Sequence, residues 1–268
     1  MEDSVKTAVK NHFDAYAGQW SSRLSSHNYN ARFRLVGRLC PENVDSVVDL
    51  GCGTGDYSKL FNGMSRYVGL DNSTEMIKTA KKLYKDQEFL VGDVANTDLP
   101  SESFDLGLAI GLFEYLEFPN EVADELHRLV ENNGLLICSF PNGEEKTPLK
   151  IPIVSHFARL IARILRKLGI IPERRDARFI PPNYSKPEQV AHRRFTVSEI
   201  ENIFANCGVT VEEIRFCNFR LIRYFIGNDV LGLLDKLLSI LISILWLDRA
   251  FSRFASNSVV RLRKHSGS

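Results

Sequence analysis

Short apolar runs alternate with helical patterns through the first half of the chain, and this alternation limits the fold more than any other feature. The runs lie at residues 46–50, 67–70, 88–91, 104–110 and 135–140. The segments with helical periodicity between them lie at residues 57–62, 73–84 and 119–130. Buried strands that alternate with helices form a parallel sheet with helices on both faces. Two later runs, 209–216 and 258–262, bring the prediction to a seven-stranded, doubly wound α/β sheet.

Two insertions interrupt this alternation. In the first, Ile151–Leu168 has one apolar half and one half made of His156 and basic residues. Such a helix lies at a membrane interface or roofs a substrate pocket, and the sequence leaves both open. In the second, Val230–Leu247 is apolar nearly all round, so it must be buried in a core, a partner or lipid. We expect a helical cap at residues 1–44 and one domain at 45–268, with insertions at about 142–194 and 218–256.

The net charge of +1 hides an asymmetry between the two parts of the chain. Residues 1–142 carry 13 Lys and Arg against 21 Asp and Glu, whereas residues 143–268 carry 21 against 12. The basic tail includes Arg249, Arg253, Arg261, Arg263 and Lys264. The second part therefore suits an anionic partner, such as a membrane surface, phosphates or nucleic acid.

Cysteine usage and the apolar segments indicate a cytoplasmic protein. The five cysteines form no CxxC pair or Cys/His cluster, so neither a metal site nor a disulfide framework is predicted. The N-terminus lacks the apolar core of a signal peptide, and no run of 18 uncharged apolar residues occurs. We expect a cytoplasmic protein, with a peripheral place on the cytoplasmic face of a membrane as a further expectation.

The loop Gly51-Cys52-Gly53-Thr54-Gly55, after the first strand, is the strongest motif. Its glycines allow a sharp turn and let a ligand lie against the main chain. Asp71 ends the next strand, 20 residues after Gly51, where an acid can bind a ribose diol. A dinucleotide fingerprint requires glycine where this chain has Asp56, and an acid there is a poor host for pyrophosphate. S-adenosylmethionine, with a sulfonium, an amino group that Asp49 could face and no phosphate, fits better.

With these motifs the sequence resembles the class I S-adenosylmethionine-dependent methyltransferases, in particular the small-molecule branch that includes ubiquinone and menaquinone biosynthesis enzymes. The resemblance is carried by VVDLGCGTG, YVGLDNSTEMIKTA, FLVGDVANTDLPSESFDLGLA, LFEYLEFP and RFTVSEIENIFANCGV. It implies a Rossmann-like sheet with an antiparallel last strand. It also implies these cofactor-binding residues: Tyr16, Asp49, Gly51, Cys52, Gly53, Asp71, Asn72, Met76, Asp93, Val94 and Ile110. Asp71 would bind the ribose, Asn72 and Met76 would lie beside the adenine, and Asp93 and Val94 would meet its amino edge.

The expected activity is methyl transfer to an oxygen, nitrogen or carbon of a small, hydrophobic or lipid-linked acceptor at or near a membrane surface. The candidates for a catalytic base are Glu114, Tyr115, Tyr184 and His192, and Tyr115 stands where these enzymes often have His. Nucleic acid is not expected as substrate, because the N/D-P-P-Y/F motif of amino-group methyltransferases is replaced by IGLF. An alternative is an inactive S-adenosylmethionine-binding subunit that tethers a partner to membrane.

Overall fold

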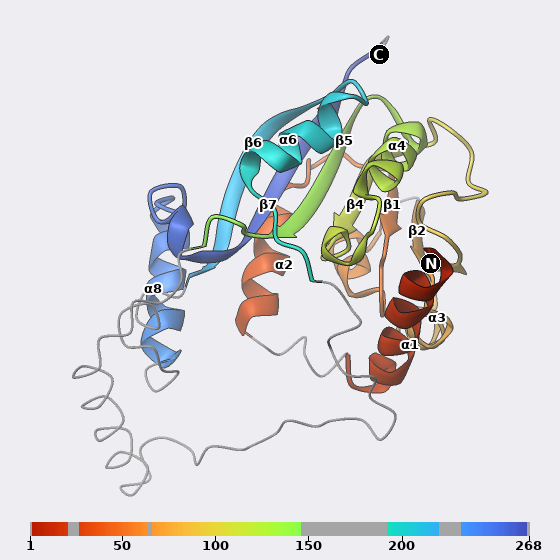
Figure 1. Ribbon diagram of the computed structural model, residues 1–268, viewed down its shortest axis with the longest axis horizontal. Coiled ribbons are helices and arrows are strands. Elements are labelled where there is room, and N and C mark those ends of the chain that lie inside the picture. Colours follow the sequence, from red (N-terminus) through yellow and green to blue (C-terminus); the bar gives the residue numbers. More distant parts are fainter. Residues whose placement is uncertain (1, 21–26, 64–65, 146–191, 220–231, 267–268) are drawn as a thin grey trace, which may run out of the picture. The chain divides into compact units, whose positions relative to one another are not determined.

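The computed structural model describes residues 2–20, 27–63, 66–145, 192–219 and 232–266 (Figure 1). The predicted amphipathic helix Ile151–Leu168 and the candidate base Tyr184 lie outside these residues.

The chain divides into two compact units. The larger unit comprises residues 1–143, 181–215 and 257–268, and the smaller unit comprises residues 144–180 and 216–256. The expected division into an N-terminal cap and one domain with two insertions stays a prediction.

Seven strands form one sheet, and the predicted fold class is confirmed. They are β1 (Ser46–Leu50), β2 (Arg66–Asp71), β3 (Glu88–Val91), β4 (Phe104–Ile110), β5 (Val130–Pro141), β6 (Val209–Phe219) and β7 (Ala255–Lys264). The strand order is β3-β2-β1-β4-β5-β7-β6. Strands β1 to β5 pair in parallel, and β7 pairs antiparallel to β5. This is a Rossmann-like sheet with an antiparallel last strand.

The sheet reverses its direction of growth between β1 and β4. The chain adds β2 and then β3 on one side of β1, and it returns to place β4 on the other side. In open α/β sheets ligands bind outside the carboxyl ends of the strands at such a switch point. The loop Gly51–Gly55 follows β1 and therefore lies where the topology favours a ligand.

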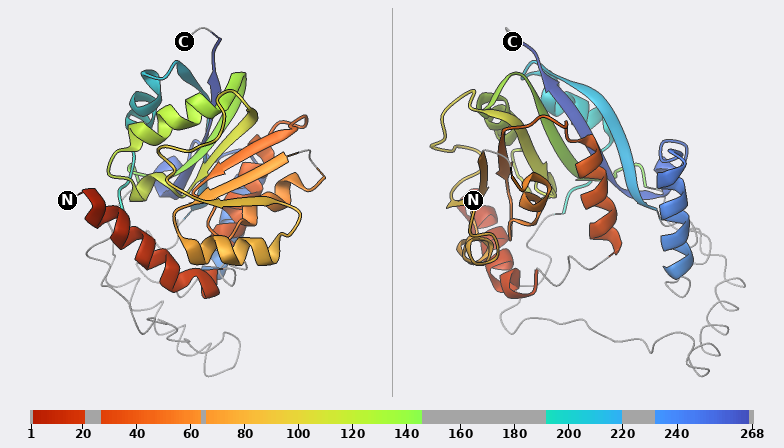
Figure 2. Two further views of the ribbon diagram at one scale, coloured as in Figure 1. Left: turned by 90° about the vertical axis from the view of Figure 1, so that its right-hand side faces the viewer. Right: turned by 180° about the vertical axis from the view of Figure 1, so that it is seen from behind.

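Helices cover both faces of this sheet. The helices are α1 (Glu2–Trp20), α2 (His27–Leu39), α3 (Thr74–Leu83), α4 (Pro119–Leu129), α6 (Val197–Ala205) and α8 (Gly232–Ile244), with short 3-10 helices η2 (Asp56–Phe61), η3 (Phe113–Tyr115) and η6 (Ser252–Phe254). Figures 1 and 2 show α4 and α6 on one face and α2 on the other. Ser73 caps α3 by accepting from the Met76 N–H, and Thr196 caps α6 through a reciprocal box with Glu199.

The helical pattern at 57–62 forms a 3-10 helix, η2, of six residues. The Ser58 N–H donates to the Gly55 carbonyl, three residues earlier, at 3.1 Å. Gly55 before the segment and Gly63 after it are both left-handed, with φ 75° and 88°. The six residues between these two turns form only a short 3-10 helix.

The core of the larger unit lies between the sheet and the pair α4 and α6. Leu126 and Leu129 of α4 and Ile200 and Phe204 of α6 are fully buried there with the inward side chains of β1, β4, β5 and β7. The helices are amphipathic, so their apolar faces are removed from water against the sheet. This packing fixes the strand ends that carry the candidate site.

In the smaller unit, α8 packs by a narrow face. Ser239 and Ile242 are buried, and the Ser239 hydroxyl donates to the Phe219 carbonyl at 3.1 Å. The sequence predicted burial of Val230–Leu247 in a core, a partner or lipid, and burial against a partner or lipid stays a prediction. Among the described residues of this segment, seven large apolar side chains are exposed. These are Leu237, Ile240, Leu241, Ile244, Leu245, Trp246 and Leu247. Within the described ranges, no helix has the length and apolar character needed to cross a bilayer.

Three residues of the basic tail are used inside the sheet. Arg261 and Arg263 of β7 both pair with Glu212 of β6. The Lys264 ammonium is buried and donates to the carbonyls of His127 and Val130, at 3.1 and 3.0 Å, and it pairs with Glu102. These three cations already have partners within the chain, so this strand offers less positive charge to an external partner than the sequence indicates.

Candidate cofactor and acceptor site

The glycine loop turns sharply away from β1 and is tied to β2. The N–H groups of Gly51 and Cys52 both donate to the Leu70 carbonyl, at 2.7 and 3.1 Å. Gly51, Gly53 and Gly55 have φ values of 71°, 55° and 75°, in the left-handed region that disfavours side chains. This explains why glycine recurs at every second position.

The three glycines differ in what surrounds them. A Cβ at Gly51 would lie 2.9 Å from a Leu112 methyl carbon, and a Cβ at Gly55 would lie 2.6 Å from the Phe89 ring. At Gly53 the nearest atom is the Trp20 indole nitrogen, 3.7 Å away. Gly51 and Gly55 therefore serve close packing, whereas a Cβ at Gly53 would make only an ordinary van der Waals contact with the Trp20 side chain.

Asp71, at the end of β2, holds this loop. Its Oδ2 accepts from the Gly53 N–H at 2.9 Å, and its Oδ1 accepts from the Ser73 N–H at 2.8 Å. Burial raises the pKa of Asp71 above its ordinary value, although these two hydrogen bonds oppose the rise. The carboxylate thus links the glycine loop to the start of α3.

Further carboxyl groups surround the loop and make it unfavourable for phosphate. Burial raises the pKa of Asp49 to about 7, and the charges of Asp71 and Asp56 add to the effect. Asp49 accepts from the Tyr67 hydroxyl at 2.7 Å, and Asp56 accepts from the hydroxyls of Thr54 and Tyr84. The negative charge of a pyrophosphate would be repelled by these carboxyl groups, whereas a cationic or zwitterionic ligand would be attracted to them.

The loop after β3 carries Asp93 and Val94. Val94 is buried, whereas Asp93 is exposed and accepts from the Ala95 N–H at 3.0 Å while pairing with Lys6 of α1 at 3.1 Å. Asn72, directly after β2, is half-buried, whereas Met76 in the first turn of α3 and Ile110 at the end of β4 are buried.

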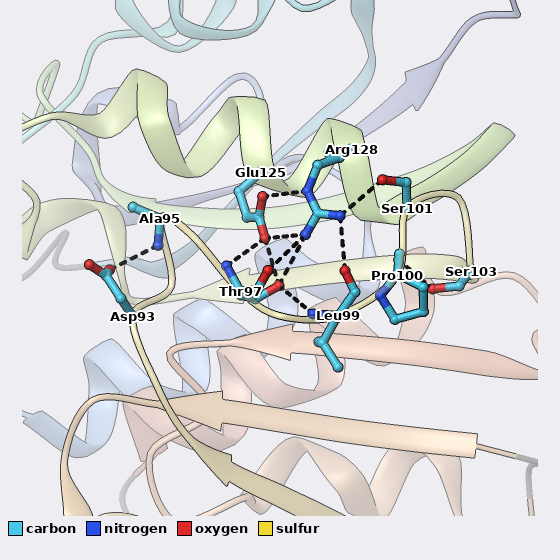
Figure 3. A network of polar contacts seen from close by, with 9 residues as sticks. All are labelled: Asp93, Ala95, Thr97, Leu99, Pro100, Ser101, Ser103, Glu125 and Arg128. Atoms are coloured by element: carbon cyan, nitrogen blue, oxygen red, sulfur yellow. Dashed lines mark hydrogen bonds and ion pairs between the residues drawn. The ribbon is translucent and has the colours of Figure 1, made fainter.

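A cluster that sequence reasoning missed fixes the loop after β3 (Figure 3). Arg128 of α4 bonds both carboxylate oxygens of Glu125 and donates to the carbonyls of Leu99 and Thr97, at 2.9 and 3.1 Å. The Glu125 carboxylate in turn accepts from the Thr97 N–H at 2.8 Å. Glu125 and Arg128 stand at i and i+3 of a helix, but such a pair is usually an exposed ion pair, so the spacing gave no signal.

Helix α1 lies along α3 at the carboxyl end of the sheet (Figure 2). Asp14 fastens it, because its carboxylate accepts from the Ser73 hydroxyl at 2.6 Å and from the Glu75 N–H at 3.1 Å. Tyr16 is buried, and its ring centre lies 4.8 Å from that of His12. The sequence predicted a covering N-terminal helix but not Asp14, which contacts residues about 60 positions away.

The structure brings the candidate bases Tyr115 and His192 together beside α1, and Glu114 precedes Tyr115 in η3. The Tyr115 ring contacts Phe13 and His192, with ring centres 5.1 and 5.5 Å apart. The Glu114 carbonyl accepts from the Arg193 N–H at 3.0 Å, which holds this stretch next to η3. Aromatic side chains from three separate segments therefore form one wall.

Glu114 is the unusual member of this group. Its side chain is buried, and its Oε2 has no hydrogen-bond partner among the described residues. Burial raises the pKa of Glu114 to about 7, although the positive charge of Arg32 lowers it. The side chains of Arg32 and Glu114 both approach Gly111. A Cβ added at Gly111 would lie 3.1 Å from an Arg32 nitrogen and 3.5 Å from the Glu114 Oε1. A carboxyl group with such a pKa can accept or release a proton near neutral pH.

Comparisons with known proteins identify the domain. Residues 48–138 match the family model described as "Methyltransferase domain". The chain is 34% identical over 145 residues to the demethylmenaquinone methyltransferase of Thermotoga maritima, covering 51% of this chain and 63% of that protein. It is 32% identical over 130 residues to the trans-aconitate 2-methyltransferase of Escherichia coli O157:H7, covering 46% and 51%.

A solved structure supports the same fold over almost the whole chain. It is the complex between the Haloferax volcanii Trm112 methyltransferase activator and a methyltransferase. The match has a TM-score of 0.61 and 18% identity, and it covers 97% of this chain and 99% of that one.

The fold and the matched region define a class I methyltransferase domain. The resemblance to S-adenosylmethionine-dependent methyltransferases seen in the sequence is confirmed for this region, and the two relatives that share it are named for demethylmenaquinone and trans-aconitate. The chain spans roughly half to two thirds of the length of these two curated relatives. The activity of the whole chain is therefore a proposal.

Proposed function

We propose that this chain transfers the methyl group of S-adenosylmethionine to a small, hydrophobic or lipid-linked acceptor at or near a membrane surface. The observation that carries the cofactor assignment is the left-handed glycine loop Gly51–Gly55 after β1, surrounded by the carboxyl groups of Asp49, Asp56 and Asp71. S-adenosylmethionine carries a sulfonium and an amino group but no phosphate, so this charge pattern suits it.

The residues present fit this cofactor. Asp71 would accept from the ribose hydroxyls with the lone pairs that its two backbone hydrogen bonds leave. Met76, Val94 and Ile110 would enclose the adenine, next to Asn72 and Asp93. Asp49, Gly51 and Cys52 would lie along the amino-acid part, and Tyr16 of α1 would cover it. When bound, the cofactor supplies a methyl group on a good leaving group, so the protein has to align the acceptor and exclude water.

The acceptor side supports a hydrophobic compound with a flat part. Phe13, Tyr115 and His192 form a wall of rings, and aromatic surfaces pack well against planar apolar groups. Glu114 is the proposed base for an acceptor that loses a proton from oxygen or nitrogen as the methyl group arrives. Its carboxylate would take that proton, so that a buried charge disappears in the step.

Two further observations bear on the setting and the acceptor. The five cysteines form no disulfide and four of them are buried, a pattern usual in a reducing compartment such as the proposed cytoplasmic location. The relatives are named for acceptors as different as demethylmenaquinone and trans-aconitate, so neither acceptor is carried over to this chain.

Methyl transfer to unfractionated acceptors tests this proposal. The purified chain is incubated with S-adenosylmethionine bearing a deuterated methyl group and with either lipid extract or aqueous metabolite extract, and mass spectrometry finds the labelled product. We expect label in the lipid extract and none with Asp71→Ala. Label only in aqueous metabolites would refute the hydrophobic acceptor. Cofactor binding without any labelled product would favour the inactive-subunit alternative, and binding of NADH in place of S-adenosylmethionine would refute the function.

A further inference from the structure

The outer face of α8 is the largest group of exposed apolar side chains among the described residues. Leu237, Leu241, Ile244 and Leu245 have exposed fractions of 54%, 50%, 59% and 53%. With Ile240 they follow the spacing i, i+3, i+4, i+7 and i+8, which places them on one side of the helix. Monomeric proteins rarely expose a contiguous apolar surface of this kind unless it binds something.

The end of α8 adds an aromatic residue to this surface. Trp246 is 58% exposed and Leu247 is 42% exposed, directly after the last turn. Trp246 has φ 56°, a conformation unfavourable for a bulky side chain. Tryptophan is enriched where an apolar medium meets water, because its ring is apolar and its N–H is polar.

The exposed charges within residues 237–254 are positive. Between residues 237 and 254 the only acid is Asp248, which is buried and accepts from the Phe216 N–H at 3.0 Å. The two cations of the same stretch, Arg249 and Arg253, are exposed. The exposed side chains of residues 237–254 are thus apolar or positively charged, which complements an anionic lipid surface.

We propose that the outer face of α8 docks on an anionic membrane surface, with its apolar side chains among the lipids and Arg249 and Arg253 at the headgroups. The helix has 13 residues, about 20 Å at 1.5 Å per residue, which is too short to span a bilayer but sufficient to lie in its interface. This docking deepens the proposed function. It rests on that function in one respect: a hydrophobic or lipid-linked acceptor would be the reason for the enzyme to approach a membrane.

Co-sedimentation of the full chain with liposomes tests the docking. We expect stronger binding to vesicles of phosphatidylcholine with phosphatidylserine than to phosphatidylcholine alone, and a decrease as salt rises. Leu241→Asp combined with Ile244→Asp should weaken binding at least tenfold. Leu83→Asp is the matched control, because Leu83 is also exposed at 47% but lies on α3, and it should leave binding unchanged.

The charge contribution has its own variants. Arg249→Glu with Arg253→Glu should weaken binding to the anionic vesicles at least tenfold, whereas Lys81→Glu with Lys82→Glu, which reverses two exposed charges on α3, should change it less than threefold. The proposal is overturned if both pairs act alike, or if neutral vesicles bind equally well. It is also overturned if wild type is a dimer without affinity for vesicles and Ile244→Asp makes it a monomer, because a second copy then covers α8.

Calorimetry with S-adenosylhomocysteine separates this proposal from the proposed function. The α8 variants should keep the wild-type affinity, because α8 carries none of the candidate cofactor residues. Absence of cofactor binding in wild type would refute the proposed function and leave the liposome result intact. Liposome binding that fails while cofactor binding persists would refute the docking alone.

Discussion

Replacing Asp71 with asparagine should weaken cofactor binding at least tenfold while the fold persists. The two oxygens of Asp71 accept from the N–H groups of Gly53 and Ser73, at 2.9 and 2.8 Å. Asparagine has one acceptor oxygen and one amino group, so one of these backbone N–H groups would face a donor. The glycine loop or the start of α3 would therefore lose its connection to the end of β2.

The magnitude follows from the kind of hydrogen bond that is lost. A hydrogen bond to a charged group contributes about 1.5–3 kcal/mol, and about 1.4 kcal/mol changes affinity tenfold. One lost bond to a bound ribose thus predicts a roughly tenfold to hundredfold weaker cofactor. Burial makes the Asp71 charge costly in the free protein, as its raised pKa shows, and asparagine removes that cost. The free energy of unfolding should consequently change less than the binding free energy.

Isothermal titration calorimetry with S-adenosylhomocysteine at pH 8 measures the effect, and Asp105→Asn is its matched control. Asp105 accepts from the N–H groups of Asp45 and Ser46, at 3.0 and 2.8 Å, but it lies at the amino end of β4. One oxygen of Asp105, Oδ2, accepts both of these hydrogen bonds, so the amide oxygen of asparagine can keep them. The control variant should therefore change the melting temperature little and keep the cofactor affinity within twofold. The reasoning is refuted if Asp71→Asn binds like wild type, or if both variants lose affinity equally.

Three other changes test separate parts of the site. The pKa of Glu114 is raised to about 7, above the ordinary carboxyl value of about 4. Between these two pH values the folded protein holds a proton on Glu114 that the unfolded chain has released. The contribution of Glu114 to the free energy of unfolding therefore falls as the pH rises from about 4 to 7. Glu114→Gln should therefore raise the melting temperature at pH 8 and change it little at pH 4; an equal rise at both values would contradict the assigned pKa. Arg128→Ala removes the cation that bonds the loop after β3 and leaves Glu125 without its ion-pair partner. Amide hydrogen exchange at 97–101 should therefore accelerate, and unchanged exchange would contradict the role of Arg128. Gly53→Ala should fold and bind cofactor weakly, whereas Gly55→Ala should be strongly destabilised by contact with a buried ring; calorimetry and thermal melts distinguish these outcomes, and equal melting temperatures would contradict the packing difference.

The sheet could be predicted closely because its strands are buried on both faces. Four of the five residues of β1 and six of the seven of β4 are buried, so each appears in the sequence as a mostly apolar run. Strand β5 extends from Val130, earlier than the predicted start at Leu135, because polar residues at Glu131–Asn133 hide the extension. Boundaries set by pairing with a neighbouring strand leave no mark in local composition.

The cofactor side of the site was predictable for the same local reason. A glycine loop after one strand and an acid after the next are brought to one sheet edge by parallel pairing, and Leu50 indeed pairs with Leu70, one residue before Asp71. The supports of that site were not predictable. Asp14 contacts Ser73 and Glu75, about 60 residues away, and Arg128 contacts Thr97, so their partners are fixed only by the folded chain.

Helix α8 shows how far an apolar pattern predicts burial. Leucine and isoleucine occur on both of its sides, so periodicity could not indicate which side packs. The packed side contains a serine, Ser239, because its hydroxyl satisfies the Phe219 carbonyl, while more hydrophobic side chains such as Leu241 and Ile244 stay exposed. Packing therefore follows shape and hydrogen bonding rather than hydrophobicity alone. The exposed apolar side chains of α8 contribute nothing to the core of the chain. Their exposure to water is unfavourable, and this is the physical reason to look for their partner outside the chain.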